Sequence, residues 1–386
     1  TRKNKSFYFD TNLKVTKNPF KIDILNYKKN EKSILKLYTK GKLSNDGLFF
    51  EKTQLSENKN IITISDLNLS ENYQIYEIGN IKIDFLDKEN LKNQIKLIKI
   101  DKNYKLIGKS LNLNKIISNL LESSNNTTNY FAKNFELLFD VEEIFLDKKN
   151  IAKNLKGFLI LSNNEITELN LESEFLDKKK IKFTIKPNDI NKKVTTLFSG
   201  NAKPLVDRYK FIKGFNEGSL DFTSVKENKK NNSSLKIYDF KLKELPVLTK
   251  LLTLASLQGI ADLLSGEGIR FDEFEMNFTN ENNLMKINEI YAIGPAISIL
   301  MEGYVEKDNL ISLRGTLVPA TTINKTISSI PVLGSILVGK KTGEGVFGVS
   351  FKIKGPPGNL ETTVNPIKTL TPRFITRTLE KIKNIK

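Results

Sequence analysis

The chain of 386 residues contains no cysteine, no histidine and no tryptophan. The lack of cysteine excludes disulfides, thiol nucleophiles and thiolate metal sites. The lack of histidine removes the side chain most used for proton transfer near neutral pH, which is also the commonest metal ligand. A catalytic centre in this chain would therefore depend on paired carboxylates, a lysine base or a hydroxyl nucleophile.

Paired carboxylates are present, but their spacing does not suit catalysis. Glu142 is adjacent to Glu143, and Asp272 is adjacent to Glu273. Neighbouring residues on a strand point to opposite faces, so neither pair converges on one substrate atom. The aspartates show no calcium-loop spacing. The sequence thus predicts a protein that is not an enzyme and that holds neither a metal ion nor another cofactor.

Arginine is scarce, although the chain is strongly basic. The net charge is +17, yet only six of the 61 basic residues are arginine, the side chain that best matches phosphate and base edges. Lysines instead alternate with apolar residues, as Lys182 does between Ile181 and Phe183. This pattern indicates a solvated strand face, so we predict no nucleic-acid partner.

Hydrophobic alternation with period two dominates the first two thirds of the chain. Within residues 1–122, for example, Ile81, Ile83 and Phe85 alternate with polar residues. Such alternation predicts mainly β structure, with one apolar and one polar face on each sheet. The phase slips by one residue within 95–100, which predicts a β-bulge or a bend.

The chain divides into segments by composition. Residues 1–122 form a first β segment, and helical spacing over 113–121 ends it in a short helix. Residues 123–129 are a polar linker without apolar anchors. Alternation resumes over 130–245 as a second β segment typical of an antiparallel meander. In 246–386 glycine and proline increase and charge falls, so we predict a distinct C-terminal domain.

Two helical regions stand out in that domain. Residues 246–264 are apolar, and their pattern predicts two short helices with a break near Gly259. Residues 371–386 begin with Thr371 and Pro372, an N-cap followed by proline at the first helical position, and form a basic amphipathic helix. A further helical piece is expected at 321–338. Strands are expected at 274–278, 297–305, 310–317 and 346–353.

The apolar strand faces have two interpretations. In a closed sandwich or barrel they form an ordinary core, whereas in a long curled sheet they line an open groove that holds acyl chains. Alternation alone does not separate the two, because both bury one face of each strand, and by itself it favours the sandwich. The terminal helix likewise either docks on its own domain, as pattern alone favours, or contacts a membrane or a partner.

A series of short motifs occurs in the last third of the chain: Pro246-Val247-Leu248, Ala255 to Phe271 (ASLQGIADLLSGEGIRF), Gly315 to Ala320 (GTLVPA), Asn324, Ile330 to Gly334 (IPVLG), Gly343-Glu344-Gly345 and Val364-Asn365-Pro366. In their order and spacing these motifs strongly resemble the C-terminal region of AsmA-like envelope proteins of the YhdP type. Upstream the resemblance is weaker and is carried by Asp207-Arg208-Tyr209 and Gly214 to Phe222.

The resemblance implies an elongated, curved antiparallel sheet that forms an apolar groove, the architecture of bridge-like lipid-transfer proteins. It implies a periplasmic protein, normally anchored in the inner membrane by an N-terminal helix that is not present in this chain. The implied function is passage of phospholipid from the inner to the outer membrane, which supports outer-membrane integrity. Both membrane surfaces and other envelope proteins are the implied partners. The alternative is an envelope scaffold or assembly factor that binds proteins without carrying lipid.

Two sets of candidate site residues follow from the pattern and the resemblance together. The first set would line the groove and solvate acyl chains, and consists of Ile81, Ile83, Phe85, Leu169, Leu171, Ile181, Phe183 and Ile185. The second set would contact a membrane or a partner, and consists of Leu251, Leu252, Leu263, Leu264, Phe374, Ile375, Leu379 and Ile382.

Overall fold

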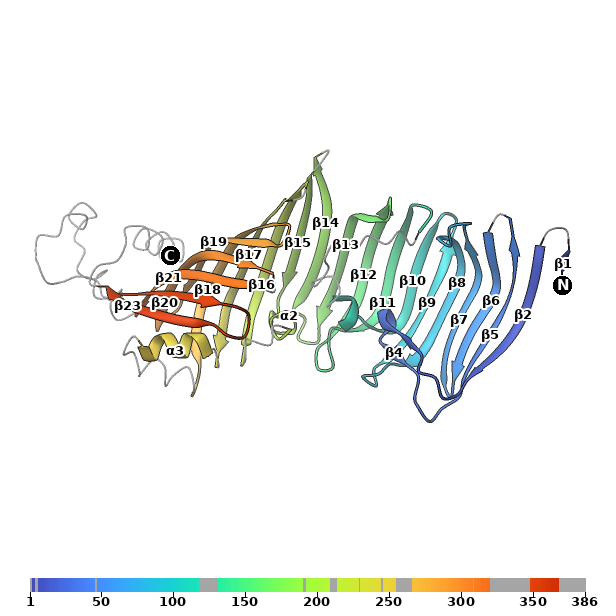
Figure 1. Cartoon of the computed structure of the whole chain (residues 1–386), viewed down its shortest axis with the longest axis horizontal. Coiled ribbons are helices and arrows are strands. Elements are labelled where there is room, and N and C mark those ends of the chain that lie inside the picture. Colours follow the sequence, from blue (N-terminus) through green and yellow to red (C-terminus); the bar gives the residue numbers. More distant parts are fainter. Residues whose placement is uncertain are drawn as a thin grey trace, which may run out of the picture. The chain divides into compact units, whose positions relative to one another are not determined.

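The computed structural model of the chain is mainly β, as the alternation predicts (Figure 1). It describes residues 2–3, 6–45, 47–117, 131–189, 192–208, 214–228, 230–243, 246–254, 266–307, 309–319 and 348–367. The chain forms two compact units, here called unit 1 (Thr1–Lys193) and unit 2 (Val194–Lys386). The boundary between them lies inside the predicted segment 130–245.

Unit 1 is built around one ladder of strands. Its elements are β1 (Arg2–Lys3), β2 (Ser6–Val15), β3 (Lys21–Ile22), the 3₁₀ turn η1 (Asp23–Leu25), β4 (Tyr27–Lys28), β5 (Leu35–Ser44), β6 (Gly47–Glu57), β7 (Asn60–Leu69), β8 (Ile75–Leu86), β9 (Lys92–Ile100), β10 (Asn103–Asn112), β11 (Phe135–Phe145), β12 (Ile151–Ser162), β13 (Glu165–Phe175) and β14 (Lys180–Asp189). Strands β2 and β5 to β10 pair in chain order and antiparallel, as do β11 to β14. The next strand, β15 (Lys192–Ser199), contains the boundary between the units.

The ladder departs from a simple meander between β10 and β11. These strands pair parallel, from Tyr104 opposite Leu137 to Asn112 opposite Phe145. A parallel pair requires a crossover connection, and the chain leaves β10 through a helical turn at residues 114–117. The antiparallel sheet that the resemblance implies is therefore interrupted by one parallel pair, where the first β segment meets the second. The predicted linker 123–129 lies outside the described residues, and the sheet continues across it.

The predicted irregularity of residues 95–100 also differs from the structure. Strand β9 pairs continuously with β8, with Leu97 opposite Ile81 and Ile98 opposite Asn80. The register shift lies instead in the neighbouring strand, between Gly108 and Ser110. The apolar side chains of Leu97 and Ile98 thus point to opposite faces of a regular strand, and no bulge within β9 is needed to explain them.

Unit 2 contains a second antiparallel ladder. Its elements are α2 (Lys203–Val206), β16 (Asn216–Glu227), β17 (Lys230–Leu242), α3 (Pro246–Leu254), β18 (Ile269–Glu281), β19 (Leu284–Ile293), β20 (Ile297–Glu306), β21 (Leu310–Pro319), β22 (Gly348–Gly355) and β23 (Glu361–Ile367). Strands β16 to β23 pair in chain order. All four strands predicted in this part of the chain are present, and a helix begins at Pro246 as predicted. The helices predicted at 321–338 and 371–386 lie outside the described residues.

The core of unit 2 lies on one face of its ladder. The rings of Phe215, Phe240 and Phe271 stack in sequence, with centroid distances of 5.4 and 5.3 Å. Helix α3 covers the same cluster with Leu248, Leu251 and Leu252. Such burial of a helix stripe against a sheet face is the usual way in which both elements remove apolar surface from water. Among the described residues, no helix is long and apolar enough to cross a bilayer.

Candidate functional site: the apolar face of unit 1

The ladder of unit 1 aligns apolar side chains from distant parts of the sequence on one face, here called the apolar face. Residues directly opposite each other in neighbouring strands share a face. The pairing from β7 to β14 therefore places one row of side chains side by side across the sheet. This middle row consists of Ile64, Ile81, Leu97, Leu106, Phe139, Leu171 and Phe183, with Gly157 at the position on β12.

The middle row is only partly covered by the chain itself. Every one of its apolar side chains is half-buried, although Ile81, Leu97 and Leu106 have apolar neighbours on both adjacent strands. With neighbouring strands about 4.8 Å apart, the row extends over roughly 34 Å from β7 to β14. Residues of a closed core would be shielded almost completely. The middle row is thus a stripe of apolar side chains that retain solvent contact.

A second row, displaced by two residues along each strand, is buried. It consists of Leu55, Ile62, Ile83, Ile95, Val141 and Leu155. These side chains belong to one hydrophobic cluster with Tyr27, Leu35, Phe85 and Leu111. On β7 to β12 the burial of the apolar face therefore increases from the middle row toward one end of the strands. This end is here called the closed end.

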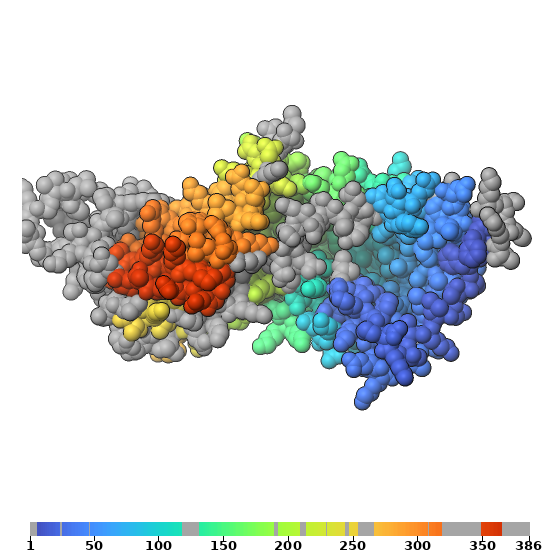
Figure 2. All heavy atoms as spheres, in the orientation of Figure 1, coloured from blue at the N-terminus to red at the C-terminus, as the bar shows by residue number. Residues whose placement is uncertain are grey.

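The segment that covers the closed end is residues 16–34, here called the strap, which connects β2 to β5 and contains β3, η1 and β4. Figure 2 shows this segment, in blue, in front of the lower end of the face. Phe20, Ile22 and Leu25 pack against the buried cluster. The ring of Tyr27 meets that of Phe85 edge to face, with centroids 5.4 Å apart. The strap thus supplies a second layer over the closed end of the face.

One carboxylate joins several groups of the strap to the sheet. Glu57, at the end of β6, is 2% exposed and accepts hydrogen bonds from the Tyr27 hydroxyl at 2.6 Å and the Asn30 N–H at 2.7 Å. The Ser33 hydroxyl also donates to it. Lys29, likewise buried, donates its amine to the carbonyls of Thr16 at 2.7 Å and Asn30 at 3.0 Å. Buried charge is tolerated here because each group has hydrogen-bond partners.

The ionisation of this carboxylate is set by two opposing effects. Burial alone would raise the pKa of the Glu57 carboxyl, but the hydrogen bonds from Ser33, Tyr27 and the Asn30 N–H, together with the charge of Lys29, outweigh it. The pKa of Glu57 therefore lies below its ordinary value. The pKa of Tyr27 is raised, first by burial and then by its hydrogen bond to Glu57 and the charge of that group. Both partners thus keep the protonation states that favour this hydrogen bond.

The opposite face of the ladder is polar. Lys182 pairs with Glu172, Lys92 with Asp84 and Lys105 with Asp140. This arrangement explains the lysines between apolar residues: they lie on the solvated face, as predicted. Among the residues that the structure describes, no group of acidic side chains could hold a metal ion.

The predicted groove-lining residues lie on the apolar face, but they are covered to different degrees. On β8, Phe85 and Ile83 are buried under the strap, whereas Ile81 is half-buried in the middle row. On β13, Leu169 is buried and Leu171 is half-buried. The three residues on β14, which are Ile181, Phe183 and Ile185, are all half-buried. Five of the eight thus retain solvent contact.

Sequence reasoning missed the residues that join β8 to β13 in the middle row. Leu97, Leu106 and Phe139 connect the two groups. Each has an apolar neighbour in sequence, so alternation alone did not assign it to one face. Sequence reasoning also missed Glu57, although a carboxylate at a position that continues the apolar alternation of Leu55 is a recognisable departure from the pattern.

The second predicted set has a different outcome. Leu251 and Leu252 are buried in the core of unit 2, and Leu252 is fully covered. Their side chains therefore contact the protein's own sheet rather than the exterior. The remaining six residues of this set, which are Leu263, Leu264, Phe374, Ile375, Leu379 and Ile382, lie outside the described residues.

No family model, no curated protein and no solved structure matches the chain.

Proposed function

We propose that unit 1 binds the acyl chains of phospholipid along the middle row of its apolar face, and that the chain carries lipid between membrane surfaces without chemical reaction. The observation that carries this proposal is the half-burial of an apolar row aligned over eight neighbouring strands. A large apolar surface left in contact with water usually marks a binding site.

The dimensions of the row suit acyl chains. The hydrocarbon core of a bilayer is roughly 30 Å thick and contains two leaflets, so one acyl chain spans about 15 Å. The middle row extends over roughly 34 Å. It therefore has room for two acyl chains end to end, lying across the strands.

The energetics show what such a row would do. Exposing the roughly thirty methylenes of a two-chain lipid to water costs on the order of 24 kcal/mol at about 0.8 kcal/mol each. An apolar row that covers one side of each chain removes a large part of this cost. Lipid could then leave a bilayer at a useful rate without an energy-consuming reaction at this site.

The proposed setting is the periplasm of a double-membrane bacterium, with phospholipid passing from the inner toward the outer membrane and supporting outer-membrane integrity. The support for this setting is the resemblance of the motifs between Pro246 and Pro366 to those of AsmA-like envelope proteins. In this setting the inner and outer membrane surfaces are the donor and the acceptor of lipid.

A photo-crosslinking amino acid tests the binding site directly. Placed at Phe183, in the middle row, it should capture phospholipid when the purified chain is mixed with vesicles of phosphatidylethanolamine and phosphatidylglycerol. Placed at Lys182, the next residue on the polar face of β14, it should capture little. Mass spectrometry of the irradiated protein measures both. Equal capture at the two positions, or none at Phe183, would contradict lipid binding at the apolar face.

Transfer itself is tested with a fluorescent phospholipid moving from donor to acceptor vesicles. Phe183→Asp introduces a charge into the middle row and should slow transfer strongly, whereas Lys186→Asp introduces the same charge on the exposed side of β14 and should not. Circular dichroism confirms that both variants fold. A wild-type chain that neither captures nor transfers lipid would favour the competing function, an envelope scaffold that binds proteins.

A further inference from the structure

Three large apolar side chains are exposed on the polar face of unit 1, near the closed end. Ile34 is 50% exposed, Ile61 39% and Leu86 48%. Strands β5 to β8 are in register on this face through the pairs Lys36–Ser56, Ser56–Ile61 and Ile61–Asp84. Ile34 precedes the first of these positions by two residues and Leu86 follows the last by two, so both continue the same face. The three side chains are here called the basal patch.

The basal patch lies on the same backbone as the buried cluster of the apolar face. Leu35, Ile62 and Phe85, its neighbours in sequence, all belong to that cluster. The N–H of Leu86 also donates to the side-chain oxygen of Asn60 at 3.0 Å, which joins the end of β8 to the start of β7. Apolar residues therefore occupy both faces of the sheet at this end, and the exposed set is held on a packed framework.

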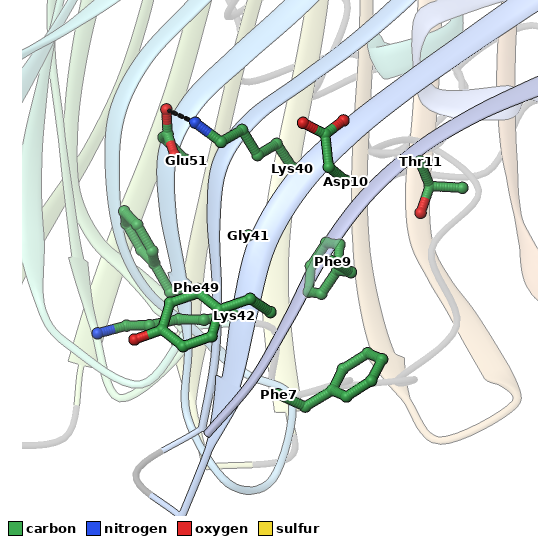
Figure 3. A pocket seen from close by; sticks show the side chains of 10 residues that line it. Phe7, Phe9, Asp10, Thr11, Lys40, Gly41, Lys42, Phe49 and Glu51 are labelled. Atoms are coloured by element: carbon green, nitrogen blue, oxygen red, sulfur yellow. Dashed lines mark hydrogen bonds and ion pairs between the residues drawn. The ribbon is translucent and has the colours of Figure 1, made fainter. Parts of the chain in front are cut away.

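Exposed lysines flank the basal patch. Each of its members has at least one at a distance of two residues in sequence, and these are Lys32, Lys36, Lys59 and Lys88. On β6 the residue opposite Lys36 is Ser56, which has no charge. Lys40, four residues further along β5, is instead neutralised by Glu51 of β6, at 2.8 Å (Figure 3). Lys36 thus keeps a positive charge that the adjacent strand β6 does not balance.

Positive charge is concentrated at this whole end of unit 1, which β4 marks in Figure 1. The segments at the closed end are 16–34, 58–59, 87–91, 113–117, 146–150 and 176–179, and together they contain twelve lysines and six acidic residues, a net charge of +6. The segments 70–74, 101–102, 131–134 and 163–164 at the opposite end contain two lysines and two acidic residues. The two ends of the strands therefore differ strongly in charge.

The turn between β13 and β14 repeats the combination of an exposed apolar side chain with lysines. Leu176 is 65% exposed, and Lys178, Lys179 and Lys180 follow it closely in sequence. The N–H of Lys178 donates to the carbonyl of Phe175 at 3.0 Å, and the N–H of Phe175 donates to the carbonyl of Lys179 at 2.7 Å. This closed turn holds Leu176 at its tip, at the same end of the strands as the basal patch.

A membrane surface that contains anionic lipid fits this arrangement better than a nucleic acid does. Apolar side chains at an interface enter the boundary between headgroups and acyl chains, while lysines beside them contact anionic headgroups. The phosphate backbone of a nucleic acid would use the lysines but not the apolar side chains. From β5 to β14 the exposed side chains extend over roughly 43 Å, which suits a broad surface.

We propose that the closed end of unit 1 docks on a membrane surface rich in anionic phospholipid. The basal patch and Leu176 enter the headgroup layer, and the lysines of the closed end bind the anionic headgroups. This docking adds a specific membrane-contact surface to the proposed function. It does not require that lipid occupy the middle row, so the two proposals can fail separately.

Cosedimentation with vesicles tests the role of charge. The purified chain should bind vesicles of equal parts phosphatidylglycerol and phosphatidylcholine, bind pure phosphatidylcholine weakly, and lose binding as salt increases. The double variant Lys59→Glu with Lys88→Glu should weaken binding more than about tenfold, since each lysine near an anionic surface contributes roughly fivefold. Lys102→Glu with Lys133→Glu is the matched control, because it makes the same change in charge at exposed positions of the opposite end, and it should leave binding nearly unchanged.

Tryptophan fluorescence tests which end enters the membrane, since the chain has no tryptophan of its own. In Leu176→Trp the emission should shift to shorter wavelength on binding and be quenched by brominated phospholipid. Tyr73→Trp is the control, because Tyr73 is 71% exposed in the turn between β7 and β8 at the opposite end, and its emission should not change. Phe183→Asp, in the middle row, should leave vesicle binding unaltered, which separates docking from lipid binding by the apolar face.

Three results would overturn the proposal. The first is a chain that does not bind the phosphatidylglycerol vesicles, including one that binds duplex DNA instead. The second is an equal loss of binding in the two double lysine variants, which would indicate attraction by net charge alone. The third is an equal spectral shift at positions 176 and 73, which would show that the closed end is not the end that enters the membrane.

Discussion

Removal of the Glu57 carboxylate tests how much this group contributes to holding the strap on the sheet. In Glu57→Ala the hydroxyl of Tyr27 loses its acceptor in a buried position, while the donors of Asn30 and Ser33 lie near the surface and can turn to water. A buried donor left without a partner costs about 1–3 kcal/mol, and the two outer hydrogen bonds add a smaller amount. We therefore expect the free energy of unfolding of unit 1 to fall by about 3 kcal/mol.

Differential scanning calorimetry measures this change. For a unit of this size, a loss of about 3 kcal/mol lowers the midpoint of thermal unfolding by roughly 6–12 °C. Glu51→Ala is the matched control, because Glu51 lies on the same strand but forms an exposed ion pair with Lys40. Exposed pairs contribute little to stability. If both variants shift the midpoint equally, the carboxylate of Glu57 does not hold the strap.

A second variant keeps the test valid if Glu57→Ala does not fold. Tyr27→Phe removes one donor and should cost about 1–2 kcal/mol. Combined with Glu57→Ala it should add little, because the two side chains share one hydrogen bond. Simple additivity of the two changes would show that this bond contributes nothing.

The pH dependence of the same pair has a defined sign. The pKa of Glu57 is lower in the folded chain than in the unfolded chain, so its stabilisation is fully present above the ordinary glutamate pKa. That stabilisation is lost as the pH falls through the lowered value in the folded state. The difference in midpoint between the wild-type chain and Glu57→Ala should therefore shrink at acidic pH. A difference that stayed constant would contradict the assigned direction.

Two further substitutions test the packing beneath the strap and under α3. Phe85→Ala should lower the free energy of unfolding by about 3–5 kcal/mol, because the ring is fully buried against Tyr27. Leu86→Ala, at the next and exposed position, should change it little. Urea unfolding measures both variants, and equal effects would refute the burial argument. Leu252→Ala should destabilise unit 2 by about 2–5 kcal/mol, and Thr253→Ala, at an exposed position, is the control. An unchanged stability in Leu252→Ala would contradict the burial of Leu252 in the core and favour contact with an external partner.

Alternation of side chains was enough to predict the strands, because their period of two depends only on local backbone geometry. It placed Ile81, Leu171 and Phe183 correctly on an apolar face and Lys182 on a polar one. Helix α3 was also predictable from its first residue, since proline is well suited to the start of a helix.

The covering of each face was not predictable in this way. Ile81 and Phe85 belong to the same alternating stretch, yet the first is half-buried and the second fully covered. Phe85 is covered by the Tyr27 ring of the strap, a residue nearly sixty positions away in the sequence. Burial depends on which remote segment lies over a strand, and the alternation within that strand contains no information about it.

The sequence alone determined that this chain would form sheets with one apolar and one polar face, and that it would lack the side chains of most catalytic centres. Only the tertiary structure decided that β10 pairs parallel with β11, and that Glu57 fastens a segment about thirty residues away in the chain. It also decided that the middle row keeps solvent contact. The physical reason is that strand formation and side-chain alternation are local, whereas pairing, burial and hydrogen-bond partners are contacts between segments far apart in sequence.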